Sequence, residues 1–439
     1  MGNAKLIVLN TFGSYGDIHP FMALAMELQS RGHHPVLATS GLYQEKIETA
    51  GLEFFPIRPE LPPPQEQDQS LIEKIMHPRT GPRFLIEDVI FAALKDSYED
   101  LFRAVEDADL LITHPATPAA PFVGRKTEMP WISTVLAPMS FLSAYDPPVP
   151  PYWPWFNHLR VLGPGVMKVA HAFIKQTFKA EQLVNFQREL GLEDWGHPMF
   201  DGQHSRELVL ALFSPLFASS QPDWPRHTRI TGFPFYDGHR ELEMPKELER
   251  FLDEGKAPIV FTLGSSAVWV AQDFFHESAT AARRLDQRAV LLIGDQRNLP
   301  TGSLSENILA VDYAPYQSLL PRASVMVHHG GIGTTAQGLR AGVPTLIVPF
   351  AFDQPDNAAH ASRLGTSLTL YRKDYRGDRL VKELDVLLSK PQYASKAKAV
   401  GERLREERGT EKACDLIEDF LRKHPRKRAL SENAYALSH

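Results

Sequence analysis

The sequence predicts an α/β protein with two Rossmann-like domains whose parallel sheets face each other across a cleft. Short apolar runs alternate with helical segments, and both halves of the chain repeat this order. Strands linked by helices in this way form parallel sheets. The 439 residues suit two domains of about 200 residues each. Ligands of such sheets bind beyond the carboxyl ends of the strands, so we expect the functional residues in the loops there.

The first half opens with a buried strand at 5–10 and a turn at 11–19. Pro20 suits the first position of a helix, which Gly32 ends as a C-cap. The pattern then predicts strands at 34–39, 52–57, 109–113 and 131–136, and helices at 42–50, 83–106 and much of 165–220.

The second half repeats this plan after a break near 234–254. Its pattern predicts strands at 258–263, 289–294, 308–312, 324–328 and 345–349, and helices at 272–286, from Gly333 onward, at 356–364 and over 379–423.

The composition excludes several classes of function. A net charge of −6 argues against a nucleic-acid partner. The single cysteine, Cys414, cannot build a disulfide framework or a thiolate metal site, and it fits a reducing compartment. Because neither a signal peptide nor an apolar run of about 18 residues is found, we expect a cytoplasmic protein without a membrane span. Peripheral contact with a membrane stays open.

One segment, at 328–338, has the features of a phosphate site. Its sequence, HHGGIGTTAQG, lies between a predicted strand and a predicted helix. Glycines allow close approach of an anion, and the start of a helix offers free N–H groups and a positive dipole end. The spacing is not that of the dinucleotide fingerprint. The segment taken alone is also compatible with a tight strand–helix turn.

This segment, together with Gly342-Val343-Pro344 and the run PFAFDQPDNA at 349–358, resembles the donor-site signature of family 1 glycosyltransferases. The first turn, Gly13-Ser14-Tyr15-Gly16-Asp17, is similar to that of the bacterial branch that includes rhamnosyltransferases and the antibiotic and sterol glycosyltransferases. The resemblance implies the GT-B fold and inverting transfer of a sugar, such as glucose or rhamnose, from a UDP- or dTDP-sugar. The acceptor would be a hydroxyl of a small, largely apolar molecule.

The resemblance also assigns the donor residues. His329 would bind the diphosphate, with Gly331, Gly333 and Thr334 as its backbone cradle. Gly264, Ser265 and Ser266 would approach the phosphates from the neighbouring strand, unless they only cap a loop. Asp353 and Gln354 would hold sugar hydroxyls, whereas in isolation they would suggest a helix N-cap; Asn357 is a weaker candidate.

The nucleoside would lie on Tyr313-Ala314, where many relatives carry tryptophan. Gln337 stands where the family often has the glutamate that binds the ribose hydroxyls. These departures do not decide between a UDP-sugar and a dTDP-sugar as donor. A neutral amide binds a ribose 2′-hydroxyl less strongly than a carboxylate does, which favours a donor with deoxyribose.

Asp17 stands at the place of the general base in the antibiotic and sterol branch. It could instead only cap the helix that follows. His19 is the alternative base, and His114 is expected near Asp17 as its partner. No Asp-x-Asp motif of the kind found in metal-dependent transferases stands in a suitable loop, so we expect metal-independent transfer without a cofactor.

The acceptor side is less defined. The stretch 146–156 combines five prolines with four aromatic residues and reads either as a stiff surface loop or as a pocket wall. The candidate acceptor residues are Phe141, Tyr145, Trp153 and Trp155. They leave lipid, sterol, polyketide and phenolic acceptors open.

We expect an acceptor domain over 1–235, a linker at 236–255, a donor domain over 256–410, a helix at 411–424 that crosses back to the first domain, and a tail at 425–439. Two alternatives use the same fold: a nucleotide-sugar epimerase and a nucleotide-sugar-binding protein without catalysis. Sugar transfer to an acceptor would separate the transferase from both.

Overall fold

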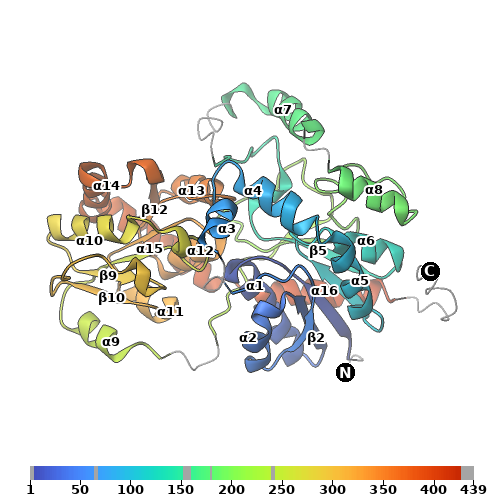
Figure 1. The fold of residues 1–439 in the computed structure, drawn as a ribbon, viewed down its shortest axis with the longest axis horizontal. Coiled ribbons are helices and arrows are strands. Elements are labelled where there is room, and N and C mark those ends of the chain that lie inside the picture. The colour runs from blue at the N-terminus through green and yellow to red at the C-terminus, as the bar shows by residue number, and fades with distance from the viewer. Residues whose placement is uncertain (1–3, 64–67, 152–159, 178–179, 239–242, 427–439) are drawn as a thin grey trace.

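The computed structural model describes residues 4–63, 68–151, 160–177, 180–238 and 243–426. It contains two parallel sheets, one in each half of the chain, as the sequence predicts (Figure 1). The first sheet has the order β3-β2-β1-β4-β5-β6-β7 and the second β10-β9-β8-β11-β12-β13. The strands are β1 Leu6–Asn10, β2 His34–Thr39, β3 Glu53–Pro56, β4 Leu110–Thr113, β5 Trp131–Val135, β6 Val209–Ala211, β7 Thr228–Ile230, β8 Ile259–Thr262, β9 Ala289–Leu292, β10 Ile308–Val311, β11 Val325–His328, β12 Thr345–Ile347 and β13 Ser367–Thr369.

The strand order positions the functional loops. In the first sheet it reverses between β1 and β4, and in the second between β8 and β11. These are the switch points at which adjacent loops diverge and leave a crevice for a ligand. Strands β4, β5, β8 and β11 are buried along their whole length, as strands of a sheet covered on both faces must be. The loops after β1, β4, β8 and β11 therefore converge at the site.

Helices cover the sheets. The larger ones are α1 Tyr15–Ser30, α2 Gln44–Thr49, α3 Gln69–Ile75, α5 Leu94–Ala104, α6 Ala119–Lys126, α7 Pro164–Thr177, α8 Glu181–Glu189, α9 Lys246–Asp253, α10 Phe274–Arg284, α12 Ile332–Ala341, α13 Gln354–Arg363, α14 Gly377–Ser389, α15 Pro391–Glu406 and α16 Gly409–Lys423. Single turns form α4 Gly81–Phe84 and α11 Tyr316–Leu319. None of the described helices is long and apolar enough to cross a bilayer.

Two helix predictions were wrong in detail. Helix α1 begins at Tyr15, because Ser14 caps it and Asp17 completes a capping box, so Pro20 lies inside the helix rather than at its start. The region 165–220 is helical only in α7 and α8. The chain then runs through turns from 190 to 208 before β6.

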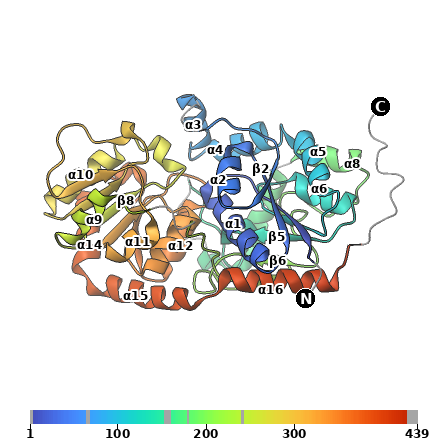
Figure 2. The ribbon, with the colours of Figure 1, turned by 90° about the horizontal axis from the view of Figure 1, so that it is seen from below.

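The C-terminal helices join the two halves. Figure 2 shows α15 along the second half and α16 along the first. Arg31, which directly follows α1, donates hydrogen bonds to Asp415 and Glu418 of α16, at 2.7 and 2.8 Å. Cys414 is buried in the same contact. One apolar core continues through both halves, with members from α1, α12, α13 and α16. The helices thus hold the two halves of the chain together along one side.

Candidate active site

The N-termini of α1 and α12 meet in the cleft. A β-carbon placed on Gly333, in the first turn of α12, would lie only 3.8 Å from the Cα atom of Gly16 in the first turn of α1. Ser14 and Asp17 cap the start of α1, whereas the start of α12 has no side-chain cap and presents its N–H groups and the positive end of its helix dipole. The junction therefore favours negative charge, such as a diphosphate or a developing oxyanion.

Asp17 lies at this junction with its two oxygens in different environments. Oδ2 accepts hydrogen bonds from the backbone N–H (2.8 Å) and the hydroxyl (3.2 Å) of Ser14. Oδ1 lies 3.5 Å from Nε2 of His114, which follows β4. A β-carbon at Gly13 would collide with Oδ2, so the turn requires glycine there, and its φ of 138° agrees. The turn thus fixes one oxygen and leaves the other for a reacting group.

The ring of His114 is buried and oriented. Its Nδ1 accepts a hydrogen bond from the backbone N–H of Ala116 at 3.2 Å, so the proton of the neutral ring resides on Nε2. That N–H faces Oδ1 of Asp17. The arrangement suits stabilisation of the Asp17 carboxylate.

His329 lies opposite, where the loops after β8 and β11 meet. The ring is buried, its Nδ1 has no partner among the described residues, and burial lowers its pKa to about 4. A β-carbon at Gly264 would lie 2.6 Å from Cε1 of His329 and 3.2 Å from Oγ1 of Thr334. One at Gly331 would lie 2.5 Å from Nε2 of the same ring. Gly264 and Gly331 therefore lie against the ring of His329, with Thr334 beside Gly264.

His328, Ser265 and Ser266 lie at the same two loops after β8 and β11. His328 ends β11 and is fully buried; its Nδ1 accepts a hydrogen bond from the N–H of Gly330. Ser265 is exposed and Ser266 half-buried after β8. Thr262 and Tyr316 share a hydrogen bond of 2.9 Å between their hydroxyls beneath the cradle.

Asp353 occupies the N-cap position directly before α13, but its side chain makes no capping hydrogen bond. Its Oδ2 accepts a hydrogen bond from Nδ2 of Asn357 at 2.7 Å, and burial raises its pKa to about 7. The charge of Asp17 also contributes to this rise in the pKa of Asp353.

Gln354 departs from the expected role in part. Its Oε1 accepts hydrogen bonds from the N–H groups of Phe350 (2.7 Å) and Ala351 (3.0 Å) and so closes the turn after β12. Only its NH₂ group can serve a ligand. Asp353 and Gln354 were expected to offer acceptors and donors to sugar hydroxyls together, and of these groups the fold already uses the oxygen of Gln354.

On the nucleoside side, Tyr313 follows β10 and is 56% exposed, whereas Ala314 is fully buried. Gln337 is half-buried on α12. Tyr236, between the two halves, has its pKa raised by burial and by the neighbouring Tyr313. An exposed tyrosine ring at this edge can stack on a base.

Comparisons with known proteins agree with this geometry. Residues 7–105 match the glycosyltransferase family 28 N-terminal domain, and residues 277–418 match the erythromycin biosynthesis protein CIII-like C-terminal domain. The O-mycaminosyltylonolide 6-deoxyallosyltransferase of Streptomyces fradiae is 31% identical, over 94% of this chain and 97% of that relative. The chain belongs to this family of glycosyltransferases.

A sterol 3-beta-glucosyltransferase of Leptosphaeria maculans is 28% identical over 94% of this chain, but the chain spans only 28% of that relative. Among solved structures, the glycotransferase of kitacinnamycin covers 96% of the chain at 23% identity with a TM-score of 0.68. Spinosyn rhamnosyltransferase SpnG, complexed with thymidine diphosphate, covers 94% at 16% identity with a TM-score of 0.65. These structures confirm the GT-B fold.

His19 lies away from the reacting groups of this glycosyltransferase. Its ring stacks between those of Tyr15 (5.2 Å) and Tyr236 (4.9 Å), and burial lowers its pKa to about 3. Two positions apart on a helix, Asp17 and His19 point to different faces. The geometry therefore disfavours His19 as the base.

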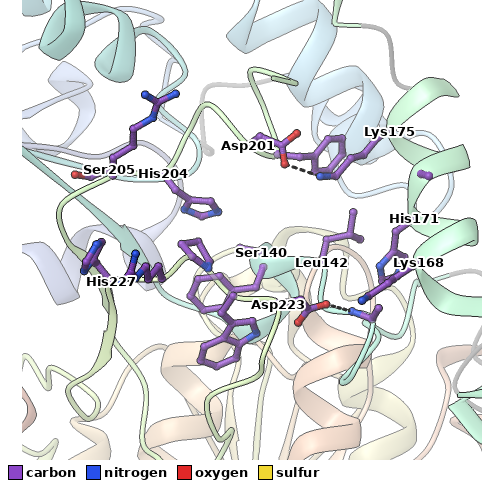
Figure 3. Close-up of a pocket in the computed structure, with 18 residues that line it drawn as sticks. Ser140, Leu142, Lys168, His171, Lys175, Asp201, His204, Ser205, Asp223 and His227 are labelled. Atoms are coloured by element: carbon purple, nitrogen blue, oxygen red, sulfur yellow. Dashed lines mark hydrogen bonds and ion pairs between the residues drawn. The ribbon is translucent and has the colours of Figure 1, made fainter. Parts of the chain in front are cut away.

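Two of the four acceptor candidates are described. Phe141 is buried and stacks on Trp224 with ring centroids 4.2 Å apart. It lines a cavity of about 600 Å³ that includes neither Asp17 nor His114 (Figure 3). Tyr145 is 40% exposed, with the Lys168 ammonium 5.4 Å from its ring centre. Trp153 and Trp155 lie outside the described residues.

A link between the proline-rich stretch and α13 was not predicted from the sequence. Asp146 pairs with Arg363 (2.7 Å) and lies 3.6 Å from Nε2 of His360. Oδ1 of Asp356 accepts a hydrogen bond from the N–H of Val149 at 3.0 Å. The glycosyltransferase thereby ties this loop to the helix that carries Asp353. No local pattern indicates such a pairing, because its partners are about 200 residues apart in the chain.

Among the residues that the structure describes, no group of three or more His, Cys, Asp or Glu side chains is arranged to hold a metal ion.

Proposed function

We propose that the chain transfers a sugar from a UDP- or dTDP-sugar to a hydroxyl of a small, largely apolar acceptor, with inversion at C1 of the sugar. The observation that carries this proposal is the approach of α1 and α12, which brings Asp17 and the His329 cradle to the two sides of one cleft. A base on one side and an anion site on the other are what an in-line displacement needs.

In the proposed reaction the acceptor hydroxyl oxygen attacks C1 as its proton passes to Oδ1 of Asp17. The bond from C1 to the diphosphate oxygen breaks, and the nucleoside diphosphate leaves with the electron pair. His114 stabilises the Asp17 carboxylate before the transfer. The N–H groups of α12 and the imidazole of His329 stabilise the charge that develops on the leaving diphosphate, in place of a metal or other cofactor.

Two observations favour a thymidine donor with a deoxysugar. Gln337 is neutral where a ribose-binding carboxylate would stand. Several structural neighbours were solved with thymidine diphosphate, and the Streptomyces fradiae relative is named for a 6-deoxyallosyl group. The acceptors named for the relatives, a tylonolide and sterols, favour an apolar acceptor.

The first test is thermal stabilisation by UDP, dTDP, GDP, ADP and NAD in EDTA. A ligand at 100 times its Kd adds about 2.7 kcal/mol to the stability of the folded state. We expect a shift with dTDP or UDP that His329→Ala abolishes and that Asp17→Asn retains. Absence of a shift with either pyrimidine diphosphate would overturn the donor assignment.

The second test offers a dTDP- or UDP-sugar with a panel of sterol, macrolide and phenolic acceptors and detects products by mass spectrometry. A glycosylated acceptor supports the transferase. An isomerised nucleotide sugar without acceptor modification would instead indicate an epimerase, and binding without any product would indicate a binding protein.

A further inference from the structure

Four polar residues share one face of α13. Asp353, Asp356, Asn357 and His360 follow one another at intervals of three, one and three residues, so they lie along one side of the helix. We refer to these four residues as the polar face of α13. Asp356, Asn357 and His360 are at most 3% exposed. Because buried polar groups are costly unless they find partners, the contacts of this face indicate what it serves.

The beginning of the polar face is bonded to the diphosphate loop. Nδ2 of Asn357 donates hydrogen bonds to Oδ2 of Asp353 (2.7 Å) and to the carbonyl oxygen of Gly330 (2.9 Å), in the loop after β11. A β-carbon at Gly330 would lie only 3.0 Å from the carbonyl oxygen of Gln354, so this loop packs directly on the start of α13. Asp353 is thus fixed relative to the loop that carries His329.

The rest of the polar face is bonded to the first half of the chain. Oδ1 of Asp356 accepts a hydrogen bond from the N–H of Val149 at 3.0 Å, and Val149 is buried. Nδ1 of His360 donates a hydrogen bond to the carbonyl oxygen of Phe217 at 2.9 Å, and the two rings pack with centroids 5.0 Å apart. Two segments of the first half, far apart in sequence, therefore hold the same helix of the second half.

Asp146 adds an ion pair to this contact. Its Oδ1 accepts a hydrogen bond from Arg363, at the end of α13 (2.7 Å), and its Oδ2 lies 3.6 Å from Nε2 of His360. Arg160 lies 3.2 Å from Oδ1. The Asp146 side chain is only 10% exposed, so solvent screens these interactions less than at a surface. The first half thereby holds both the middle and the end of α13.

We propose that three residues, Asp146, Asp356 and His360, position α13 for the proposed transfer. Through them the first half, which carries Asp17, fixes the place of Asp353 in the second half. The three residues act through the helix and not on the sugar itself. An in-line displacement needs the base and the sugar in one fixed geometry, so a small shift of α13 reduces its rate. The inference rests on the proposed function, because Asp353 holds a sugar only if the chain binds a nucleotide sugar.

The test compares the Kd of dTDP with that of dTDP-glucose, and the Kd of UDP with that of UDP-glucose, by isothermal titration calorimetry. Asp146→Ala should raise the Kd of the sugar nucleotide about threefold to tenfold, as expected when a hydrogen bond to the sugar is weakened. The Kd of the free nucleotide should stay near that of the wild type, since the diphosphate lies in the His329 cradle. Asp146 and Asp353 belong to different halves, so a merely local role of Asp146 would leave the ratio of the two Kd values unchanged.

A second pair of variants tests the same contact from α13. Asp356→Ala removes the acceptor of the Val149 N–H and should change the ratio in the same direction. Asp356→Asn keeps an oxygen for that N–H and should recover most of the lost affinity for the sugar nucleotide. With an acceptor found by screening, kcat of Asp146→Ala should fall about tenfold to a hundredfold. Asp146 lies in a loop, so the test stands even if Asp356→Ala does not fold.

Asp100→Ala is the matched control for the loss of a buried carboxylate. Asp100 on α5 is 5% exposed and accepts a hydrogen bond from Arg58 at 2.7 Å. The control should lower Tm and leave the ratio of the Kd values and kcat unchanged. An unchanged ratio in Asp146→Ala and Asp356→Ala, with both variants folded by circular dichroism, would overturn the positioning role and leave the proposed function intact. If the wild type bound neither pyrimidine nucleotide, the donor assignment would fall, and this inference with it.

Discussion

Nε2 of His114 lies 3.5 Å from Oδ1 of Asp17, and the hydrogen bond from Ala116 to Nδ1 leaves the His114 proton facing the carboxylate. The pair joins the loops after β1 and β4, which are neighbouring strands at the switch point of the first sheet. In the proposed reaction Asp17 is the base and His114 stabilises its carboxylate.

Asp17→Asn should lower kcat by about 10² to 10⁴, because an amide cannot accept the acceptor proton. Donor binding should change little, since the cradle lies on the other side of the cleft. His19→Gln is the matched control on the same helix, and it should keep turnover within a few fold. Steady-state kinetics with an acceptor found by screening would decide. A larger loss for His19→Gln would make His19 the base.

His114→Ala should reduce kcat about tenfold to a hundredfold while the KM for donor stays near that of the wild type. The reason is that His114 acts through Asp17 rather than on the donor. A role in packing alone would lower Tm and leave kcat and the pH profile of the folded enzyme unchanged. His114→Gln, which can still donate a hydrogen bond, should recover part of the lost turnover; turnover of His114→Ala equal to wild type contradicts the pairing.

Gly264→Ala should abolish nucleotide binding. Gly264 has φ of 62°, and a β-carbon there would collide with the ring of His329. Gly302→Ala is the control: its φ is 87°, but nothing lies within 4 Å of the added carbon. Both substitutions carry a backbone cost of about 1 kcal/mol. Only Gly264→Ala should lose the dTDP shift; retention of that shift would mean that the cradle is looser than the structure indicates.

Asp353→Asn should become more stable relative to wild type as pH rises from about 4 to about 7. In this window the folded wild type keeps a proton on Asp353, whose pKa is raised to about 7, while the unfolded chain has lost it. Stability of the wild type therefore falls with rising pH, and the variant lacks this loss. Tm measured from pH 4.5 to 7.5 tests this. Asp378→Asn, at a side chain 95% exposed, should show a constant difference from wild type. A constant difference for Asp353→Asn as well would contradict the raised pKa.

Transfer should continue in EDTA, because in the proposed mechanism His329 and the start of α12 stabilise the leaving diphosphate without a metal. Turnover measured in EDTA and after addition of Mg²⁺ should agree within about twofold. Strict dependence on Mg²⁺ would require another account of how the leaving group is stabilised.

The sequence by itself determined the repeated strand–helix plan, the donor segment and the family. These depend on local information: apolar periodicity specifies strands and helices, and glycines beside a histidine specify a close backbone approach to an anion. It also contained the Ser14-to-Asp17 capping pattern, which the proline at position 20 obscured.

Only the tertiary structure decided which side chains meet. Strand order brought His114 to Asp17, the turn after β12 used the oxygen of Gln354, and Phe141 stacked on Trp224. The exposure of Val166 and Val169 on α7 was equally hidden, because helical periodicity gives an apolar stripe but not the side on which the rest of the protein packs. Such relationships depend on the packing of segments far apart in the chain, which no local pattern encodes.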